Sequence, residues 1–91
     1  NQNGENPKQL YKNDSSMVWI SSVHGSKDMY VGLFNISNNA HDIDVDFPKL
    51  GIKGKGTVRD LWKKTDTGIF KKKYGQMINA HGCALLRIKV K

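Results

Sequence analysis

Turn-forming residues interrupt this sequence at short intervals, and their spacing is the feature that most constrains the fold. Clusters rich in Gly, Asn, Ser, Pro and Asp stand at residues 24–28, 37–40, 48–51 and 79–82. Turn signals about every 8–12 residues between short extended runs are typical of β-sandwiches and barrels. No stretch repeats apolar residues at the three-to-four spacing of a helix over two turns. The sequence therefore predicts an all-β fold, either an antiparallel sandwich or a barrel.

The predicted strands differ in how their two sides are filled. Residues 42–47 alternate cleanly between apolar and acidic side chains, so one side is expected to face the core. The last strand, 83–90, points Ala84 and every second residue after it inward. Residues 69–78 are extended but mixed, and Gly75 predicts a bulge or bend within them.

The totals indicate one domain with one modest core. The chain has 91 residues, of which 37% are hydrophobic and 25% charged, a globular composition. Residues 1–14 resemble a linker or entry segment with a candidate short strand at residues 9–12, and residues 15–91 are assigned to the β domain. No apolar run of about eighteen residues is present, so no membrane span is expected. The first fourteen residues lack the apolar segment of a signal peptide, and the compartment is not indicated.

Positive charge is concentrated in the second half of the chain. The net charge is +7, and residues 51–91 hold eleven of the fifteen Lys and Arg but only two acids. A basic half can bind nucleic acid, although lysines on strands and turns more often keep a sheet edge solvated. An oligonucleotide-binding β-barrel is therefore an alternative, and it requires exposed aromatic residues beside Lys71, Lys72 and Lys73.

Few residues suggest chemistry. Cys83 is the only cysteine, which excludes an internal disulfide and a thiolate metal site, and we interpret it as a small buried hydrophobe. The histidines at 24, 41 and 81 stand in three separate turns without metal-ligand spacing, so hydrogen bonding within turns is expected. Two glycosylation sequons occur, at Asn13 and Asn35. No cofactor is predicted.

Three aspartates on one strand are the strongest catalytic candidates, but the pattern argues against them. Asp42, Asp44 and Asp46 are two residues apart, so neighbouring carboxylates lie roughly 7 Å from each other, near the separation in glycosidase acid pairs. A catalytic acid needs burial to raise its pKa, whereas these side chains follow the polar side of an amphipathic strand. We interpret them as solvated, and a flat strand does not wrap a calcium ion.

One short strand and its turn, residues 58–68, stand at the centre of the predicted fold. Val58, Asp60 and Trp62 share one side of this strand. We predict that Trp62 is buried in the core beside Val58, and that backbone N–H groups or a hydroxyl hold Asp60. Alternatively, Trp19 or Trp62 is exposed and stacks on sugar, as in a free-standing carbohydrate-binding module.

Residues 17–23 and 29–36 are apolar on both sides. An antiparallel strand of this kind is either central and covered on both faces, or it belongs to a patch that another domain covers. The candidate patch consists of Val18, Ile20, Tyr30, Phe34 and Ile36.

A series of short segments, in order, resembles the C-terminal domain of α-galactosidases in glycoside hydrolase family 27. These segments are MVWI at 17–20, YVGLFN at 30–35, LG at 50–51, VRDLW at 58–62, DTG at 66–68, AHG at 80–82 and LLRI at 85–88. The most specific positions within them are Arg59, Asp60, Trp62, Gly68, His81 and Gly82.

The resemblance implies a Greek-key β-sandwich that follows a (β/α)₈ catalytic barrel and packs on it. In that family a retaining mechanism uses two aspartates of the barrel, and the motifs of both are missing from this chain. The resemblance therefore implies a non-catalytic accessory domain. Its expected partner is the barrel of the same polypeptide, carbohydrate is the substrate of the whole enzyme, and neither nucleic acid nor membrane is an expected partner.

Overall fold

The computed structural model describes residues 4–23 and 27–90, and these form a β-sandwich, as predicted. The described part of the chain contains no apolar helix of membrane-spanning length. The elements are β1 (Gly4–Lys12), β2 (Ser16–Val23), β3 (Met29–Asn35), β4 (His41–Asp46), the 3₁₀ helix η1 (Phe47–Leu50), β5 (Lys55–Asp60), β6 (Thr65–Lys71), β7 (Lys73–Ile78) and β8 (Cys83–Val90).

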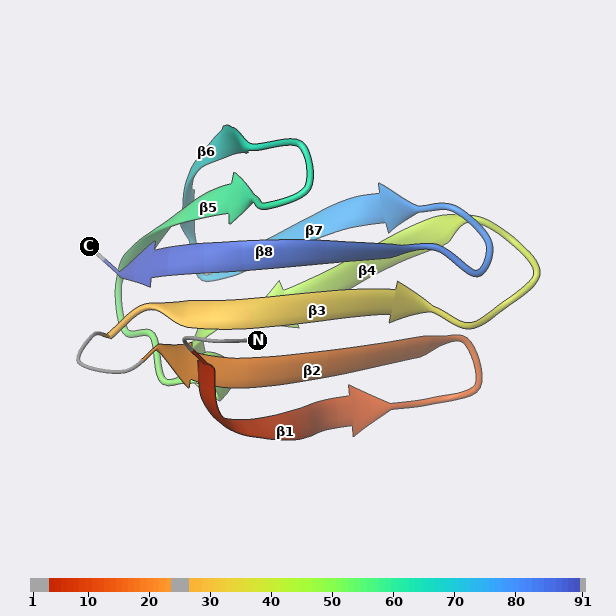
Figure 1. Ribbon diagram of the computed structural model, residues 1–91, viewed down its shortest axis with the longest axis horizontal. Coiled ribbons are helices and arrows are strands. Elements are labelled where there is room, and N and C mark those ends of the chain that lie inside the picture. The colour runs from red at the N-terminus through yellow and green to blue at the C-terminus, as the bar shows by residue number, and fades with distance from the viewer. Residues whose placement is uncertain (1–3, 24–26, 91) are drawn as a thin grey trace.

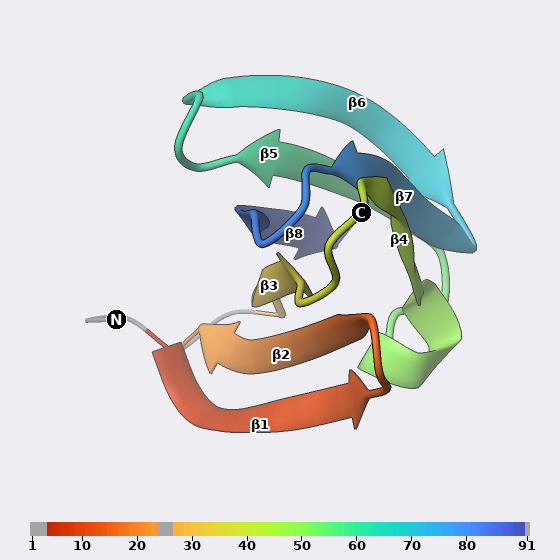
Figure 2. The same cartoon turned by 90° about the vertical axis from the view of Figure 1, so that its right-hand side faces the viewer.

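The strands form two antiparallel sheets of unequal size (Figure 1). The large sheet has the order β1-β2-β3-β8-β5-β6, and the small one pairs β4 with β7. The large sheet is curved, and β4 and β7 face its concave side (Figure 2). Strand β8 returns from the small sheet to pair with both β3 and β5. Strand β8 follows β5 by three strands in the chain and yet pairs directly with it, so the topology has the Greek-key form.

The core lies between the two sheets and is aliphatic. Alternate residues of β2, β3, β5 and β8 point into it, while β4, η1 and β7 close the other side. Ala84, Leu86 and Ile88 are buried, as predicted for the last strand. The fully buried aliphatic and aromatic side chains are Val18, Val31, Leu33, Ile43, Val45, Phe47, Val58, Leu86 and Ile88.

The pairing register decides which sides of β2 and β3 face outward. Val18 lies opposite Leu33, and both are buried in the core. Since residues directly opposite each other share a face, the neighbouring pair of Met17 and Phe34 points away from the core. The predicted patch therefore mixed two faces. Val18 and Ile20 are core residues at 0% and 4% exposure, whereas Tyr30 and Phe34 belong to the outer side.

Two predictions about local structure are wrong. Residues 69–78 are not one strand, because the chain turns at Lys72, whose φ of 67° ends β6 and starts β7. Gly75 marks no bulge, since the β4–β7 register is regular there. Gly75 instead lies opposite Asp44, whose carboxylate occupies the space that a Cβ would need.

The candidate strand at residues 9–12 is present, and it begins earlier than predicted, within the segment that resembles a linker or entry segment. Strand β1, Gly4–Lys12, pairs along β2 at the edge of the large sheet, with two register irregularities. Leu10 and Tyr11 pack against the core, and the hydroxyl of Tyr11 donates to the backbone carbonyl of Asp44 at 3.4 Å. The position of the domain boundary stays a prediction, but residues 4–12 contribute to the sandwich.

Candidate functional site

The outer face of the large sheet carries a group of half-buried and exposed apolar side chains, which we call the apolar patch. It consists of Met17, Trp19, Tyr30, Phe34 and Leu85. The register places Trp19 and Leu85 on either side of Gly32. The ring of Phe34 covers this glycine, because a Cβ there would stand 2.8 Å from Phe34 Cε1. Trp19 is the most exposed member, at 39%.

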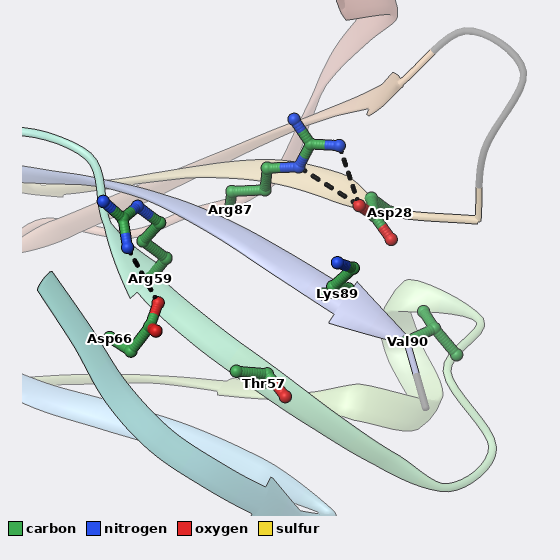
Figure 3. A pocket seen from close by; sticks show the side chains of 7 residues that line it. All are labelled: Asp28, Thr57, Arg59, Asp66, Arg87, Lys89 and Val90. Carbon is green, nitrogen blue, oxygen red and sulfur yellow. Dashed lines mark hydrogen bonds and ion pairs between the residues drawn. The ribbon is translucent and has the colours of Figure 1, made fainter. Parts of the chain in front are cut away.

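A charged depression adjoins the apolar patch on the same face. Its volume is about 740 Å³, and its lining residues come from β5, β6, β8 and the start of β3 (Figure 3). These residues are Asp28, Thr57, Arg59, Asp66, Arg87, Lys89 and Val90. Sequence reasoning singled out only Arg59 among them, because the others become neighbours through the non-consecutive pairing of β3, β8 and β5.

Arg59 and Arg87 lie directly opposite each other in the depression, and each forms an ion pair with an aspartate. Arg87 donates from Nε and Nη2 to Oδ2 of Asp28, at 3.1 and 2.8 Å. Arg59 donates from Nη1 to Asp66 Oδ1 at 3.0 Å and from Nη2 to the carbonyl of Lys64 at 3.0 Å. Like charges directly opposite in a sheet repel, so these acids are needed to hold the pair.

Arg87 joins the charged depression to the apolar patch. The hydrogen bonds that Arg87 donates to Asp28 raise the pKa of its guanidinium above the usual value, although desolvation opposes this shift. The guanidinium carbon also lies 5.8 Å from the centre of the Tyr30 ring, within cation–π range. The outer face therefore combines aromatic surface with fixed guanidinium groups.

The other predicted acids stay apart from this site. Asp42, Asp44 and Asp46 are exposed on β4, as predicted. Within residues 4–23 and 27–90, no group of three or more His, Cys, Asp or Glu side chains is arranged to hold a metal ion.

The turn hydrogen bonds predicted for the histidines are only part of what the described residues show: His41 begins β4 with its Nδ1 3.3 Å from the carbonyl of Asn39 in the preceding turn, whereas the shortest contacts of His41 and His81 reach residues distant in sequence. His41 Nε2 lies 2.8 Å from the hydroxyl of Ser16, and His81 Nε2 lies 2.8 Å from Asn38 Oδ1. His24 lies outside the described residues. Cys83 is half-buried rather than fully buried, at the start of β8.

The two sequons differ in accessibility. Asn35 is 1% exposed, and its side-chain amide donates to the carbonyls of Asn39 and Ile78, so it is a structural residue of the β3–β4 turn. Asn13 is exposed, but its Oδ1 accepts from the backbone N–H groups of Ser15 and Ser16 at 2.8 Å. Both asparagines organise turns.

The turn after β5 overturns one prediction and confirms another. Asp60 is buried, and its Oδ1 accepts the backbone N–H groups of Trp62 and Lys63 at 3.0 and 2.9 Å, as expected of a held carboxylate. These bonds end the strand at Asp60. Trp62 therefore lies in the turn at 60% exposure and is not a core residue beside Val58.

The remaining motif positions shape turns or strand irregularities. Gly68, at a φ of 132°, pairs with Val58 where the β5–β6 register shifts. His81 has a φ of 57°, and the N–H of Gly82 donates to the carbonyl of Asn79 at 2.8 Å. Whether these positions have a functional role stays a prediction.

The aromatic residues next to the lysine run pack against the core. Lys71, Lys72 and Lys73 are exposed, but their aromatic neighbours are not displayed beside them. Phe70 and Tyr74 pack edge to face with ring centres 4.8 Å apart, and Tyr74 is buried. Neither ring therefore offers, beside this run, the exposed aromatic face that an oligonucleotide-binding barrel requires.

Comparison with known proteins assigns the fold to a family. The family of the α-galactosidase C-terminal β-sandwich domain matches residues 13–88. A probable alpha-galactosidase D of Aspergillus flavus is 29% identical over 72 residues, which cover 79% of this chain and 11% of that protein. A probable alpha-galactosidase D of Aspergillus fumigatus is 24% identical over 82 residues, covering 90% of this chain and 12% of its own length.

Solved structures show the same arrangement. A family 27 β-L-arabinopyranosidase of Geobacillus stearothermophilus is 28% identical with a TM-score of 0.92, and the match covers 98% of this chain and 20% of that one. Alpha-galactosidase I of Mortierella vinacea shares the fold with a TM-score of 0.85 at 18% identity, over 93% of this chain and 23% of its own.

The chain spans about a tenth of the length of the curated relatives that it matches. The matching family is described as a C-terminal β-sandwich domain of α-galactosidases. This chain thus belongs to the family of C-terminal β-sandwich domains of glycoside hydrolase family 27 α-galactosidases, in which it is an accessory, non-catalytic domain.

Proposed function

We propose that the domain packs on a (β/α)₈ catalytic barrel of the same polypeptide through the outer face of its large sheet. The observation that carries this proposal is the apolar patch. It lies on the central strands β2, β3 and β8, on the side away from a core that is already complete. A solvated face of an antiparallel sheet is normally polar, so an aromatic one indicates a partner surface.

The charged depression suits the edge of such an interface. Protein interfaces typically place aromatic residues at a dry centre and charged groups at a wet rim. Here Trp19 and Phe34 would occupy the centre, and the two arginine–aspartate pairs the rim. Because Asp28 and Asp66 already pair with the arginines, Lys89 is left as a further cation for an acidic group on the partner.

The proposed role is structural. Covering the patch removes apolar surface from water and couples the stability of the barrel to that of the sandwich. The whole polypeptide would act on a glycoside, with retaining hydrolysis in the barrel, as the α-galactosidase relationship supports. The isolated chain is expected to hydrolyse no aryl α-galactoside above a denatured control.

Oxidative footprinting of methionine and tryptophan tests the interface. Met17 and Trp19 should be oxidised in the isolated chain and protected in the longer polypeptide. Met77, which is 59% exposed on the small sheet, is the matched control and should react in both. Equal oxidation of Trp19 in the two proteins would contradict docking through this face.

A charge substitution gives a second test. Trp19→Lys should leave the melting temperature of the isolated chain nearly unchanged, because the side chain lies outside the core. In the longer polypeptide it should lower the melting temperature of the catalytic domain. Met77→Lys, the control, should change neither.

A further inference from the structure

A second concave surface lies at the seam between the two sheets. It is a cleft of about 210 Å³. Its walls come from the turn after β5, the end of β7 and the start of β8, so both sheets contribute. The lining residues are Asp60, Trp62, Lys63, Gln76, Met77, Ile78, Asn79, Gly82, Cys83 and Ala84.

Two large hydrophobic side chains are exposed at this cleft. Trp62 and Met77 are 60% and 59% exposed, the highest values among large hydrophobic residues in the described part of the chain. The backbone at Trp62 is held in place, since the Asp60 carboxylate accepts its N–H and that of Lys63. The cleft thus presents an indole on a turn that is already ordered.

The same cleft is also lined by Asp60, whose carboxylate is held by backbone hydrogen bonds. Both backbone donors bind Oδ1 of Asp60, whereas Oδ2 makes no hydrogen bond or ion pair to residues 4–23 or 27–90. No buried side-chain oxygen of those residues lacks a partner, so Oδ2 must reach the surface, and Asp60 lines the cleft.

The amides add donors to this acceptor. Gln76 accepts the hydroxyl proton of Tyr74 on Oε1 at 2.6 Å, and this contact orients its NH₂ group as a donor. Asn79, which also bears an amide, lines the cleft as well. The cleft is therefore lined by a tryptophan, an aspartate and two residues with side-chain amides.

We propose that this cleft binds one pyranose ring of a carbohydrate. The apolar face of the ring would stack on Trp62, a hydroxyl would donate to Asp60 Oδ2, and another would accept from Gln76 or Asn79. A volume below the roughly 300–1,000 Å³ of typical ligand pockets allows a single ring rather than an extended chain. This site does not depend on the docking proposal, because it lies at the seam rather than on the outer face.

Titration of the 91-residue chain with galactose and with raffinose tests the site. We expect saturable, millimolar binding by calorimetry, because small weakly buried ligands bind weakly. Trp62→Ala should weaken binding at least about fivefold through loss of stacking, and Trp62→Phe should restore part of it. Trp19→Ala is the matched control, and it should leave the dissociation constant unchanged.

Cys83 provides an independent measure, because it lines the cleft and is the only cysteine. Bound sugar should slow its alkylation in the native chain but not in Trp62→Ala.

If Trp62→Ala fails to fold, Gln76→Ala replaces it and should weaken binding. The absence of saturable binding, or binding that survives Trp62→Ala and is lost in Trp19→Ala, would overturn the proposal. The proposal would also be overturned if Trp62 and Met77 were protected from oxidation in the longer polypeptide without sugar. That result would mean that another domain covers the cleft.

Discussion

The two faces of the large sheet are built from the same strands but carry different kinds of side chain. The inner face is almost wholly aliphatic and buried, and its buried polar residues include Ser16, Asn35 and Asp60. The outer face combines the aromatic rings of the apolar patch with the guanidinium groups of Arg59 and Arg87. Aliphatic side chains fill a core, whereas aromatic residues and arginine are enriched at interfaces. The inner face therefore determines stability, and the outer face is suited to recognition.

Adjacent leucines on β8 give the largest contrast between the faces. Leu86 is fully buried on the inner face, whereas Leu85 is half-buried on the outer one. Leu86→Ala should lower the free energy of unfolding by about 3–5 kcal/mol, and Leu85→Ala by about 1 kcal/mol or less in the isolated chain. Urea denaturation of the two variants measures both values. Similar losses would mean that the outer face is packed in solution.

Two glycines sharpen the same comparison. A methyl group at Gly56 would lie 2.8 Å from Ile88 Cγ2 and 3.1 Å from Phe47 Cε2, between side chains that are both buried. Gly56→Ala should therefore cost about 1–3 kcal/mol through overpacking.

On the outer face, the three atoms nearest to a methyl group at Gly32 all belong to the ring of Phe34, at 2.8–3.9 Å. That ring is half-buried and can swing toward solvent, so Gly32→Ala should cost less than Gly56→Ala. Thermal melts of the two variants decide the order, and a reversed order would show that Phe34 cannot move.

Alternation along the chain was enough to predict the fold class and much of the core. Ala84, Leu86 and Ile88 follow a simple period of two, and so do the outward aspartates of β4. The outer face could not be assigned in this way, because β2 and β3 are apolar on both sides. Only the pairing register shows that Tyr30 and Phe34 share a face with Met17 and not with Val18.

The candidate sites were harder to predict, because their residues are distant in sequence. Arg59 and Arg87 become neighbours only when β8 inserts between β3 and β5. The cleft likewise needs the end of β7 beside the turn after β5. Local patterns do not contain such contacts, although resemblance to a family correctly implied the sandwich and its accessory role.

The burial of Tyr74 beneath the inner face predicts that the domain loses stability at high pH. Desolvation raises the pKa of the Tyr74 hydroxyl, and the charge on Asp60 adds to this shift, while a hydrogen bond with Thr67 opposes it. A raised pKa in the folded state means that stability is fully present below the unfolded pKa of about 10 and is lost as pH rises through the folded value.

Tyr74→Phe should flatten this alkaline loss. The variant should also be slightly less stable at neutral pH, because the hydrogen bond to Gln76 disappears. The pKa of Tyr11 is raised too, mainly by burial, so the double variant with Tyr11→Phe should be flatter still. Melting temperatures between pH 7 and roughly pH 11 check both expectations, and parallel curves for all three proteins would contradict them.

The smallest expected change in stability comes from Trp62, although its alternation with Val58 and Asp60 predicts a core residue. The prediction fails because the Asp60 carboxylate accepts the N–H groups of Trp62 and Lys63, and the strand ends before Trp62 is reached. Trp62→Ala should therefore change the free energy of unfolding by about 0.5 kcal/mol or less, and the melting temperature by less than about 4 °C.

Val58→Ala is the matched inner-face variant, because Val58 is fully buried and lies two residues before Asp60. It should cost roughly 1.5–3 kcal/mol. A collapse of the Trp62→Ala melt would show that the indole packs against the sandwich in solution. A near-native melt of Trp62→Ala combined with loss of sugar binding would instead show that the two residues have different roles. Val58 would stabilise the fold, and Trp62 would bind a ligand.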